Sequence, residues 1–290
     1  MSAVEWRLAG RALQLNRPLI MGIINVTPDS FSDGGKFFSP SAAAAHGRML
    51  IAMGADLLDV GGESTRPQGA TPVSEDEELR RVLPVLDALH DSHPHIPISI
   101  DTVKSAVARA VLAHGADIIN DVSGFRLDPA MAEVCADQNA GVILMHSRGD
   151  VATMGTYADA GYGDDVVGEI ITELGARVEW ARAAGVARER IAIDPGVGFA
   201  KRTEHSLAVL RELSRFAELG VPVAIGVSRK RFIGELSGAK ELDDRIDGTT
   251  AANVLALAGG ARIFRVHDVD HARRALDMAW SILGLGEGEA

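Results

Sequence analysis

The chain has 290 residues, 47% of them hydrophobic and only 4% aromatic, so it can bury a large core of mostly aliphatic side chains. The 40 acidic residues outnumber the 29 basic ones, and the net charge of −11 argues against a nucleic-acid partner, which requires a basic surface. The single cysteine, Cys135, excludes an internal disulfide, and without a signal peptide or a long apolar run we expect no membrane partner and a cytoplasmic location.

Residues 1–18 predict a short N-terminal β-hairpin. Within this segment, Val4–Leu15 reads as two strands around Ala9-Gly10. We expect the hairpin to cover the floor of the larger fold that follows.

A recurring pattern then indicates parallel strands. A helical stretch ends at Gly, and a short apolar run follows that ends in polar side chains. Gly suits the left-handed position that closes a helix, and the apolar run suits a strand buried on both faces. Eight such runs can be read, at Leu19–Asn25, 54–60, Ile96–Asp101, 115–121, Gly141–His146, Ile191–Asp194, Val221–Val227 and 260–265.

Helical segments lie between these strands. Ser74–His90 has apolar residues at helical spacing, and Ser74 followed by Glu77 predicts a capping box. Asp101-Thr102 predicts the cap of a second helix over Val103–His114.

Eight alternating strand–helix units predict an α/β fold of the (β/α)8 TIM-barrel type, which usually needs about 250 residues. An open, doubly wound sheet is the alternative. That fold normally has a Gly-rich dinucleotide loop after its first strand, whereas Thr27-Pro28-Asp29-Ser30-Phe31 follows here. No linker-like stretch interrupts the chain, so we expect one domain over residues 1–290 with a frayed tail at 284–290.

The predicted strands all end in polar residues, and in a TIM barrel these ends form the active site. Any one of them can simply cap the next helix, but together they predict a binding site. Asp101, Asn120 and Asp194 suit a flat heterocycle with several N–H groups, and Lys230 adds a cation. The ends in chain order are Asn25, Asp59, Asp101, Asn120, His146, Asp194, Ser228 and Arg265 with His267.

A pair of residues after the eighth strand and two loops are further candidates for substrate binding, and each also has a purely structural explanation. Arg265 and His267 follow the eighth strand, where such barrels commonly bind phosphate, but they can also be a surface pair. The Gly-bearing loops Thr27–Phe38 and Gly61–Pro72 follow barrel strands on the same side, and they are either substrate loops or ordinary connections.

Several of these segments resemble one known family. Residues 21–35, Met-Gly-Ile-Ile-Asn-Val-Thr-Pro-Asp-Ser-Phe-Ser-Asp-Gly-Gly, resemble the first signature of the dihydropteroate synthases, and Gly61-Gly62-Glu63-Ser64-Thr65-Arg66-Pro67 resembles the second. Further matches follow in the family's order at 99–102, 119–124, 145–146, 194–199, 228–230 and 265–269. The resemblance extends from about Leu19 to the last helix.

This resemblance implies a transferase of folate biosynthesis, which joins 6-hydroxymethyl-7,8-dihydropterin pyrophosphate to 4-aminobenzoate with release of pyrophosphate. It implies Mg²⁺ as the cofactor, with Asn25 as a metal ligand, and small molecules as the partners. The implied pterin-binding residues are Asp101, Asn120, Met145, Asp194 and Lys230. The implied diphosphate-binding residues are Asn25, Thr65, Arg265 and His267, and those for aminobenzoate are Phe31, Asp33, Thr65, Arg66, Phe199 and Ser228.

Departures from the family pattern are few. Gln68 lengthens the second loop by one residue, Ala200 stands where many relatives have Gly, and Ser206 where Asn is common. One alternative is a pterin-binding methyltransferase. The other is a catalytically silent paralogue, and we expect such a paralogue to have lost part of the motif at 63–66 or of the motif at 228–230. The family also implies a homodimer through an apolar stripe on the last helices, although the stripe can instead pack on the barrel. Its residues are Ala275, Leu276, Met278, Ala279, Trp280 and Leu283.

Overall fold

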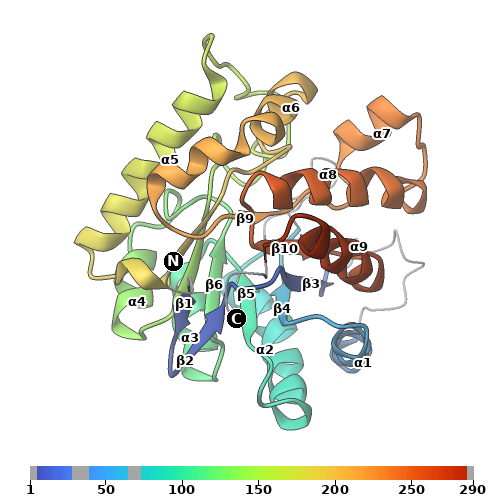
Figure 1. Cartoon of the computed structure of the whole chain (residues 1–290). Helices are drawn as coiled ribbons and strands as arrows, with labels where there is room; N and C mark the ends of the chain where they lie inside the picture. The colour runs from blue at the N-terminus through green and yellow to red at the C-terminus, as the bar shows by residue number, and fades with distance from the viewer. Residues whose placement is uncertain (1–4, 28–38, 65–72, 286–290) are drawn as a thin grey trace.

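In the computed structural model, eight parallel strands form one sheet that closes on itself (Figure 1). The structure describes residues 5–27, 39–64 and 73–285. The strand order is β8-β7-β6-β5-β4-β3-β10-β9, and a bridge between Ile193 and Val223 joins the two ends of the sheet. The strands are β3 (Leu19–Asn25), β4 (Leu57–Gly61), β5 (Ile98–Asp101), β6 (Ile118–Asp121), β7 (Gly141–Met145), β8 (Ile191–Asp194), β9 (Ala224–Ile225) and β10 (Ile263–Val266).

Helices surround the strands, as Figure 1 shows, and this arrangement is the predicted (β/α)8 barrel. The helices are α1 (Pro40–Ala52), α2 (Glu75–Ser92), α3 (Ser105–Ala113), α4 (Met131–Asp137), α5 (Val166–Ala183), α6 (Thr203–Arg211), α7 (Arg231–Ser237), α8 (Ile246–Ala258) and α9 (Val269–Ile282). Short 3-10 turns are η2 (Arg188–Arg190), η3 (Leu213–Leu219) and η4 (Asp243–Arg245).

The predicted hairpin is confirmed as β1 (Glu5–Leu8) and β2 (Arg11–Gln14), which pair in antiparallel fashion. Trp6 and Leu8 are buried in a cluster with residues from the beginnings of the barrel strands, including Met21. The Trp6 indole donates a hydrogen bond to the Arg190 carbonyl at 2.8 Å, so its one polar atom is satisfied. The hairpin therefore covers the floor of the barrel, opposite the strand ends that carry the site.

The repeated Gly-Ala-Asp segments explain how neighbouring units are joined at this floor. Gly54 and Gly115 adopt φ of +100° and +96°, the left-handed conformation that was predicted to end each helix. The following Asp56 and Asp117 carboxylates accept hydrogen bonds from the backbone N–H groups of Ile20 and Ile98, each at the beginning of an adjacent strand. Each carboxylate therefore satisfies a strand-end donor that the sheet leaves over.

Three local predictions need correction. The strand expected over Val221–Val227 is only β9, because pairing with β10 and the bridge from β8 engage just its central residues. Helix α3 begins at Ser105, and its first N–H is capped by Asp128 at 2.7 Å instead of by Asp101-Thr102. Ser74 does cap α2, but the Glu77 side chain pairs with nearby arginines, so only half of the capping box forms.

The stripe on α9 is divided between the barrel and the surface. Leu276 and Ala279 are buried in the core, and Trp280 packs against it. Met278 and Leu283 are 63% and 43% exposed. Packing on the barrel therefore explains part of the stripe, and an exposed apolar edge remains. No described helix is long and apolar enough to cross a membrane.

Candidate active site

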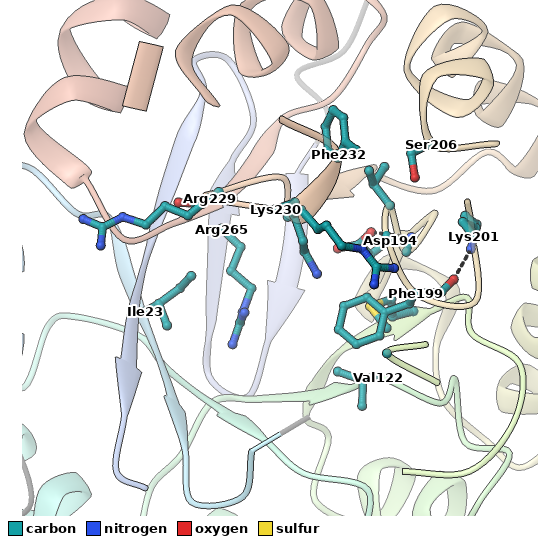
Figure 2. Close-up of a pocket in the computed structure, with 18 of the residues that line it drawn as sticks. Ile23, Val122, Asp194, Phe199, Lys201, Ser206, Arg229, Lys230, Phe232 and Arg265 are labelled. Carbon is teal, nitrogen blue, oxygen red and sulfur yellow. Dashed lines mark hydrogen bonds between the residues drawn. The ribbon is translucent and has the colours of Figure 1, made fainter. Parts of the chain in front are cut away.

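A cavity of about 550 Å³ opens at the C-terminal ends of the barrel strands (Figure 2). This is the end at which the polar strand termini were predicted to meet. The ten predicted site residues that the structure describes all line it: Asn25, Asp101, Asn120, Met145, Asp194, Phe199, Ser228, Lys230, Arg265 and His267. The other four, Phe31, Asp33, Thr65 and Arg66, lie outside the described residues, as does Gln68.

Two predicted strand-end residues lie beneath the cavity and do not line it. The buried Asp59 carboxylate accepts hydrogen bonds from Arg265 Nε at 2.6 Å and from the Asn120 amide at 3.2 Å. Arg265 also donates to Asp101 at 2.9 Å. Asp59 therefore orients both the Asn120 amide and the Arg265 guanidinium, which line the cavity. His146, which was also expected at the mouth, is buried behind the loop that follows β8.

Burial and charge shift the pKa values of the acids on the cavity floor. Burial raises the pKa of Asp101, an effect that the nearby Arg265 charge opposes. Burial also raises the pKa of Asp194, which a hydrogen bond from the Gly196 N–H at 2.7 Å partly offsets. Both acids are thus held in a poorly solvated place, where a ligand with N–H donors recovers the lost interactions.

Lys230 lies between Arg265 and Phe199 in the view of Figure 2. Burial, followed by the Arg265 charge, lowers its pKa to about 7. Its amine nitrogen lies 3.8 Å from the centre of the Phe199 ring, the arrangement of a cation–π contact. A cation expected beside the pterin and an aromatic ring expected beside aminobenzoate are therefore in direct contact.

The segment 228–230 is fixed by its neighbours. Ser228 Oγ lies 2.9 Å from His267 Nδ1 and accepts a hydrogen bond from the His267 backbone N–H. Arg229, at φ +58°, directs its side chain away from the floor into a two-point ion pair with Asp268. The middle residue of the motif thus anchors the loop, and the residues on either side face the cavity.

The loop after β8 has an unusual backbone. Gly196, Gly198 and Ala200 have φ of +68°, +79° and +45°. Ala200 thus has a Cβ in a backbone conformation that favours glycine, the residue that the family pattern leads us to expect at this position. Its N–H donates to the Met154 carbonyl at 2.7 Å, a contact that helps to hold this conformation.

The sequence reasoning missed Lys201, which lines the cavity from beneath this loop. Its side chain is buried, and burial lowers its pKa to about 7. Its position directly after a Gly-rich segment that follows a buried strand was the available signal.

The described lining is more basic than acidic. Six Lys and Arg side chains line the cavity, against three Asp and Glu side chains, in a chain whose net charge is −11. A local excess of positive charge attracts a polyanion against the field of the whole molecule. In the described ranges no three His, Cys, Asp or Glu side chains gather as a metal centre. The fold and this cavity therefore indicate a barrel enzyme whose site suits a polar, anionic ligand.

Comparison with known proteins narrows this class. Residues 21–267 match the family described as pterin binding enzyme. Dihydropteroate synthase of Synechocystis sp. is 46% identical over 254 residues, which cover 88% of this chain and 86% of that protein. The structure of Xanthomonas albilineans dihydropteroate synthase with 4-aminobenzoic acid has a TM-score of 0.89 at 46% identity, covering 97% of this chain and 99% of that one. The chain belongs to the dihydropteroate synthase family of pterin-binding enzymes.

One relative shows that similarity alone does not establish activity. The inactive dihydropteroate synthase 2 of Mycobacterium tuberculosis is 42% identical over 281 residues, covering 96% of this chain and 87% of that protein. The case for an active enzyme therefore depends on the residues of the cavity.

Proposed function

We propose that this chain is an active dihydropteroate synthase. It condenses 6-hydroxymethyl-7,8-dihydropterin pyrophosphate with 4-aminobenzoate, and it releases 7,8-dihydropteroate and pyrophosphate. The observation that carries this proposal is the gathering of Asp101, Asn120 and Asp194 with Lys230 and Arg265 in one cavity. Such a floor offers acceptors to a heterocycle next to cations for a diphosphate.

The reaction makes modest demands on the protein. The bond between the pterin methylene carbon and the diphosphate oxygen breaks, and its electron pair leaves with the diphosphate. The amine nitrogen of 4-aminobenzoate then bonds to the methylene carbon and loses a proton. No covalent intermediate with the protein is needed, so catalysis consists of positioning the reactants and stabilising charge as it separates.

The described residues suit these tasks. Asp194 and Asp101 accept hydrogen bonds from the pterin edge, and Asn120 supplies an amide oriented by Asp59. Met145 lines the same cavity, and in this proposal it lies beside the pterin ring. A hydrogen bond from a ligand N–H group to a buried carboxylate is charge-assisted and therefore stronger than one between neutral groups.

The departing diphosphate lies nearer the mouth in this proposal. Asn25 and His267 bind it together with Arg265, and Ser228 links His267 to the aminobenzoate side. The cationic lining stabilises the leaving group as its charge develops.

Mg²⁺ is the proposed cofactor, held by Asn25 and the diphosphate. In the sheet Asn25 pairs with Gly61, and its Oδ1 lies 3.9 Å from where a Cβ on that glycine would lie, so the glycine leaves room beside the amide. Mg²⁺ commonly takes few protein ligands and completes its shell with phosphate oxygens and water. When bound, it would neutralise diphosphate charge.

Two alternatives remain distinct from this proposal. A silent paralogue is expected to have lost part of its motifs, whereas this sequence retains both Glu63-Ser64-Thr65-Arg66 and Ser228-Arg229-Lys230. A pterin-binding methyltransferase handles no diphosphate and has no need of the cationic cluster that includes Lys230, Arg265 and His267.

The deciding experiment measures pyrophosphate release and identifies dihydropteroate by mass spectrometry, with both substrates and Mg²⁺ present. Turnover that requires both substrates supports the proposal. A folded protein that binds the pterin pyrophosphate without turnover is a silent paralogue. Equal affinity for pterins with and without the diphosphate would instead favour the methyltransferase.

We further propose a cytoplasmic homodimer. Cys135 is buried as a free thiol, which suits a reducing compartment. Leu255 on α8 and Met278 and Ile282 on α9 are 65%, 63% and 76% exposed, and the two helices pack side by side (Figure 1). Apolar side chains at this exposure favour a partner surface. Light scattering that reports a monomer at micromolar concentration would refute the dimer.

A further inference from the structure

Lys201 is a buried lysine that contacts three acceptors at once. Its residue is 1% exposed, and its Nζ lies 2.8 Å from His146 Nδ1, 3.1 Å from the Phe199 carbonyl oxygen and 3.4 Å from the His146 carbonyl oxygen. A buried amine needs such acceptors, because each N–H group without one loses the hydrogen bond that water provided. The three contacts join the loop after β8 to the end of β7.

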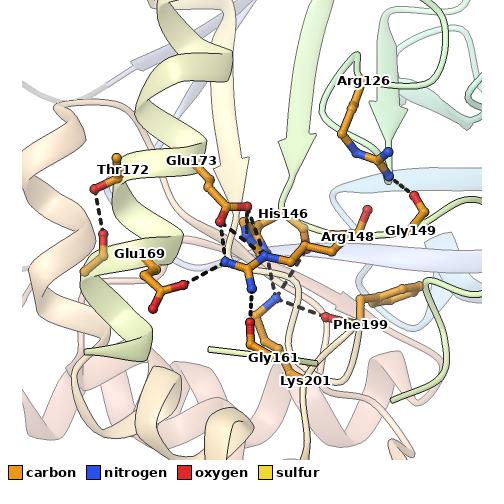
Figure 3. Close-up of polar contacts among 12 residues, drawn as sticks. Arg126, His146, Arg148, Gly149, Gly161, Glu169, Thr172, Glu173, Phe199 and Lys201 are labelled. Atoms are coloured by element: carbon orange, nitrogen blue, oxygen red, sulfur yellow. Dashed lines mark hydrogen bonds and ion pairs between the residues drawn. The ribbon is translucent and has the colours of Figure 1, made fainter. Parts of the chain in front are cut away.

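The orientation of the His146 ring is fixed from its other side. Glu173 on α5 has a carboxylate oxygen 3.0 Å from His146 Nε2 (Figure 3). A carboxylate can only accept, so Nε2 carries the proton and the Nδ1 lone pair faces Lys201. Burial, followed by the Lys201 charge, lowers the pKa of His146 to about 4, which keeps the ring neutral and in this one tautomer at neutral pH.

Glu173 is itself held by Arg148. The guanidinium donates to Glu173 at 3.2 Å and to Glu169 at 2.9 Å, and it lies 4.0 Å from the centre of the Tyr162 ring. These contacts anchor Glu173, although 41% of its side chain is exposed. A chain of polar contacts therefore runs from the surface of α5 through His146 and Lys201 to the Phe199 carbonyl.

The far end of this chain is the residue that faces the aromatic substrate in the proposed site. Lys201 binds the Phe199 carbonyl from below, and Lys230 contacts the Phe199 ring at 3.8 Å from its centre. Gly196, in the same loop, is pressed against the His146 carbonyl, where an added Cβ would lie 1.9 Å from the oxygen. The segment 195–202 between β8 and α6, here called the Phe199 loop, is thus held in position by contacts at the end of β7.

We propose that Lys201 is a positioning residue: with His146 and Glu173 it fixes the Phe199 loop in the position that binds the aromatic co-substrate. This inference rests on the proposed function, in which that co-substrate is 4-aminobenzoate. If the loop occupies the binding position for a smaller fraction of the time, the apparent dissociation constant of the aromatic co-substrate rises by the same factor. The pterin contacts of Asp101 and Asn120 come from other strands, and Asp194 is the last residue of β8, before this loop, so pterin binding depends less on the position of Phe199.

The experiment compares KM for the two substrates in Lys201→Met and Glu173→Gln. Lys201→Met keeps most of the length and the apolar stem of the side chain but removes its donors. Lys240→Met, at an exposed lysine, and Glu179→Gln, at an exposed glutamate of the same helix α5, are the matched controls. We expect KM for 4-aminobenzoate to rise about tenfold or more in Lys201→Met, and at least about fivefold more than KM for the pterin substrate.

The double variant tests whether the two residues act through His146. If they do, Glu173→Gln adds little once Lys201 has been replaced, and the two effects are not additive. Should Lys201→Met fail to fold, Glu173→Gln carries the test alone, because its partly exposed side chain tolerates the change. It must then raise KM for 4-aminobenzoate selectively.

The outcomes separate this inference from the proposed function. If the unmodified protein turns over, three results in the variants would overturn the positioning role and leave the proposed synthase activity intact. They are equal KM changes for both substrates, a lower kcat with unchanged KM, and additive effects in the double variant. No turnover by the unmodified protein would overturn the proposed function, and the inference with it.

Discussion

Replacing Gly196 with alanine tests whether the loop after β8 depends on its glycine backbone. Gly196 adopts φ +68°, and an added Cβ would lie 1.9 Å from the His146 carbonyl oxygen. That oxygen belongs to the backbone at the end of β7, so no side-chain rotation can relieve the contact. Either the strand end or the loop must move, and the loop carries Phe199 and Lys201.

The magnitude follows from two separate costs. A side chain in the left-handed region costs about 1–2 kcal/mol, and overpacking against a rigid neighbour costs a further 1–3 kcal/mol or so. Gly238→Ala is the matched control, because Gly238 has φ +75° but no atom within 4 Å of its added Cβ. We therefore expect Gly196→Ala to lose about 2–5 kcal/mol of unfolding free energy and Gly238→Ala no more than about 2 kcal/mol.

Urea unfolding of both variants measures this difference, and calorimetry with 4-aminobenzoate measures its consequence for the site. Gly196→Ala should bind 4-aminobenzoate more weakly than the unmodified protein, whereas Gly238→Ala should bind it normally. Equal stability losses in the two variants would falsify the steric argument. Normal binding by Gly196→Ala would show that the loop position does not determine the aromatic site.

Four further predictions follow from the site. Asp194→Ala should weaken pterin binding at least about tenfold in calorimetry, because a hydrogen bond to a charged group is lost; unchanged affinity in a folded variant would contradict its role. His267→Ala should weaken the binding of pyrophosphate more than the binding of an uncharged pterin, as measured by calorimetry. Equal losses of affinity for the two ligands would indicate a structural role for His267. Lys230→Met should stabilise the protein more at pH 6 than at pH 9, as measured by thermal unfolding. The pKa of Lys230 is about 7 in the fold against an ordinary 10.5. The free-energy cost of burying its charge is therefore complete below pH 7 and disappears as the pH rises towards 10.5. Finally, 4-aminobenzoate should bind better with Mg²⁺ and pyrophosphate than without them, and equal affinities would mean that the two ligands are not coupled.

Local sequence patterns predicted most of the barrel because the physical causes are local. The Gly-Ala-Asp segments contain the helix end, the strand start and the bracing carboxylate within a few residues. Leu19–Asn25 and Ile191–Asp194 have the predicted bounds. The predicted strand Val221–Val227 was too long, because a strand's length depends on neighbours that are distant in sequence.

The site divides in the same way. Strand-end residues such as Asp101 and Asp194 could be predicted, because the fold places every strand end at one mouth. The function of Asp59 could not, because it depends on Arg265, 206 residues later in the chain. Lys201 contacts His146 across 55 residues, and nothing in either local segment indicates the pairing. Long-range polar pairs need the fold before they can be recognised.

The buried charges of the cavity link binding to stability. Burial raises the pKa of Asp194 and lowers those of Lys201 and Lys230, so the free protein disfavours the charged form of each group. In the proposed reaction, a pterin that donates to Asp194 and a diphosphate near Lys230 would favour the charged forms of these two groups. Bound substrate should therefore stabilise the fold in proportion to its affinity. The same poorly solvated groups are already oriented when the diphosphate departs, and this preorganisation is what catalysis by charge stabilisation requires.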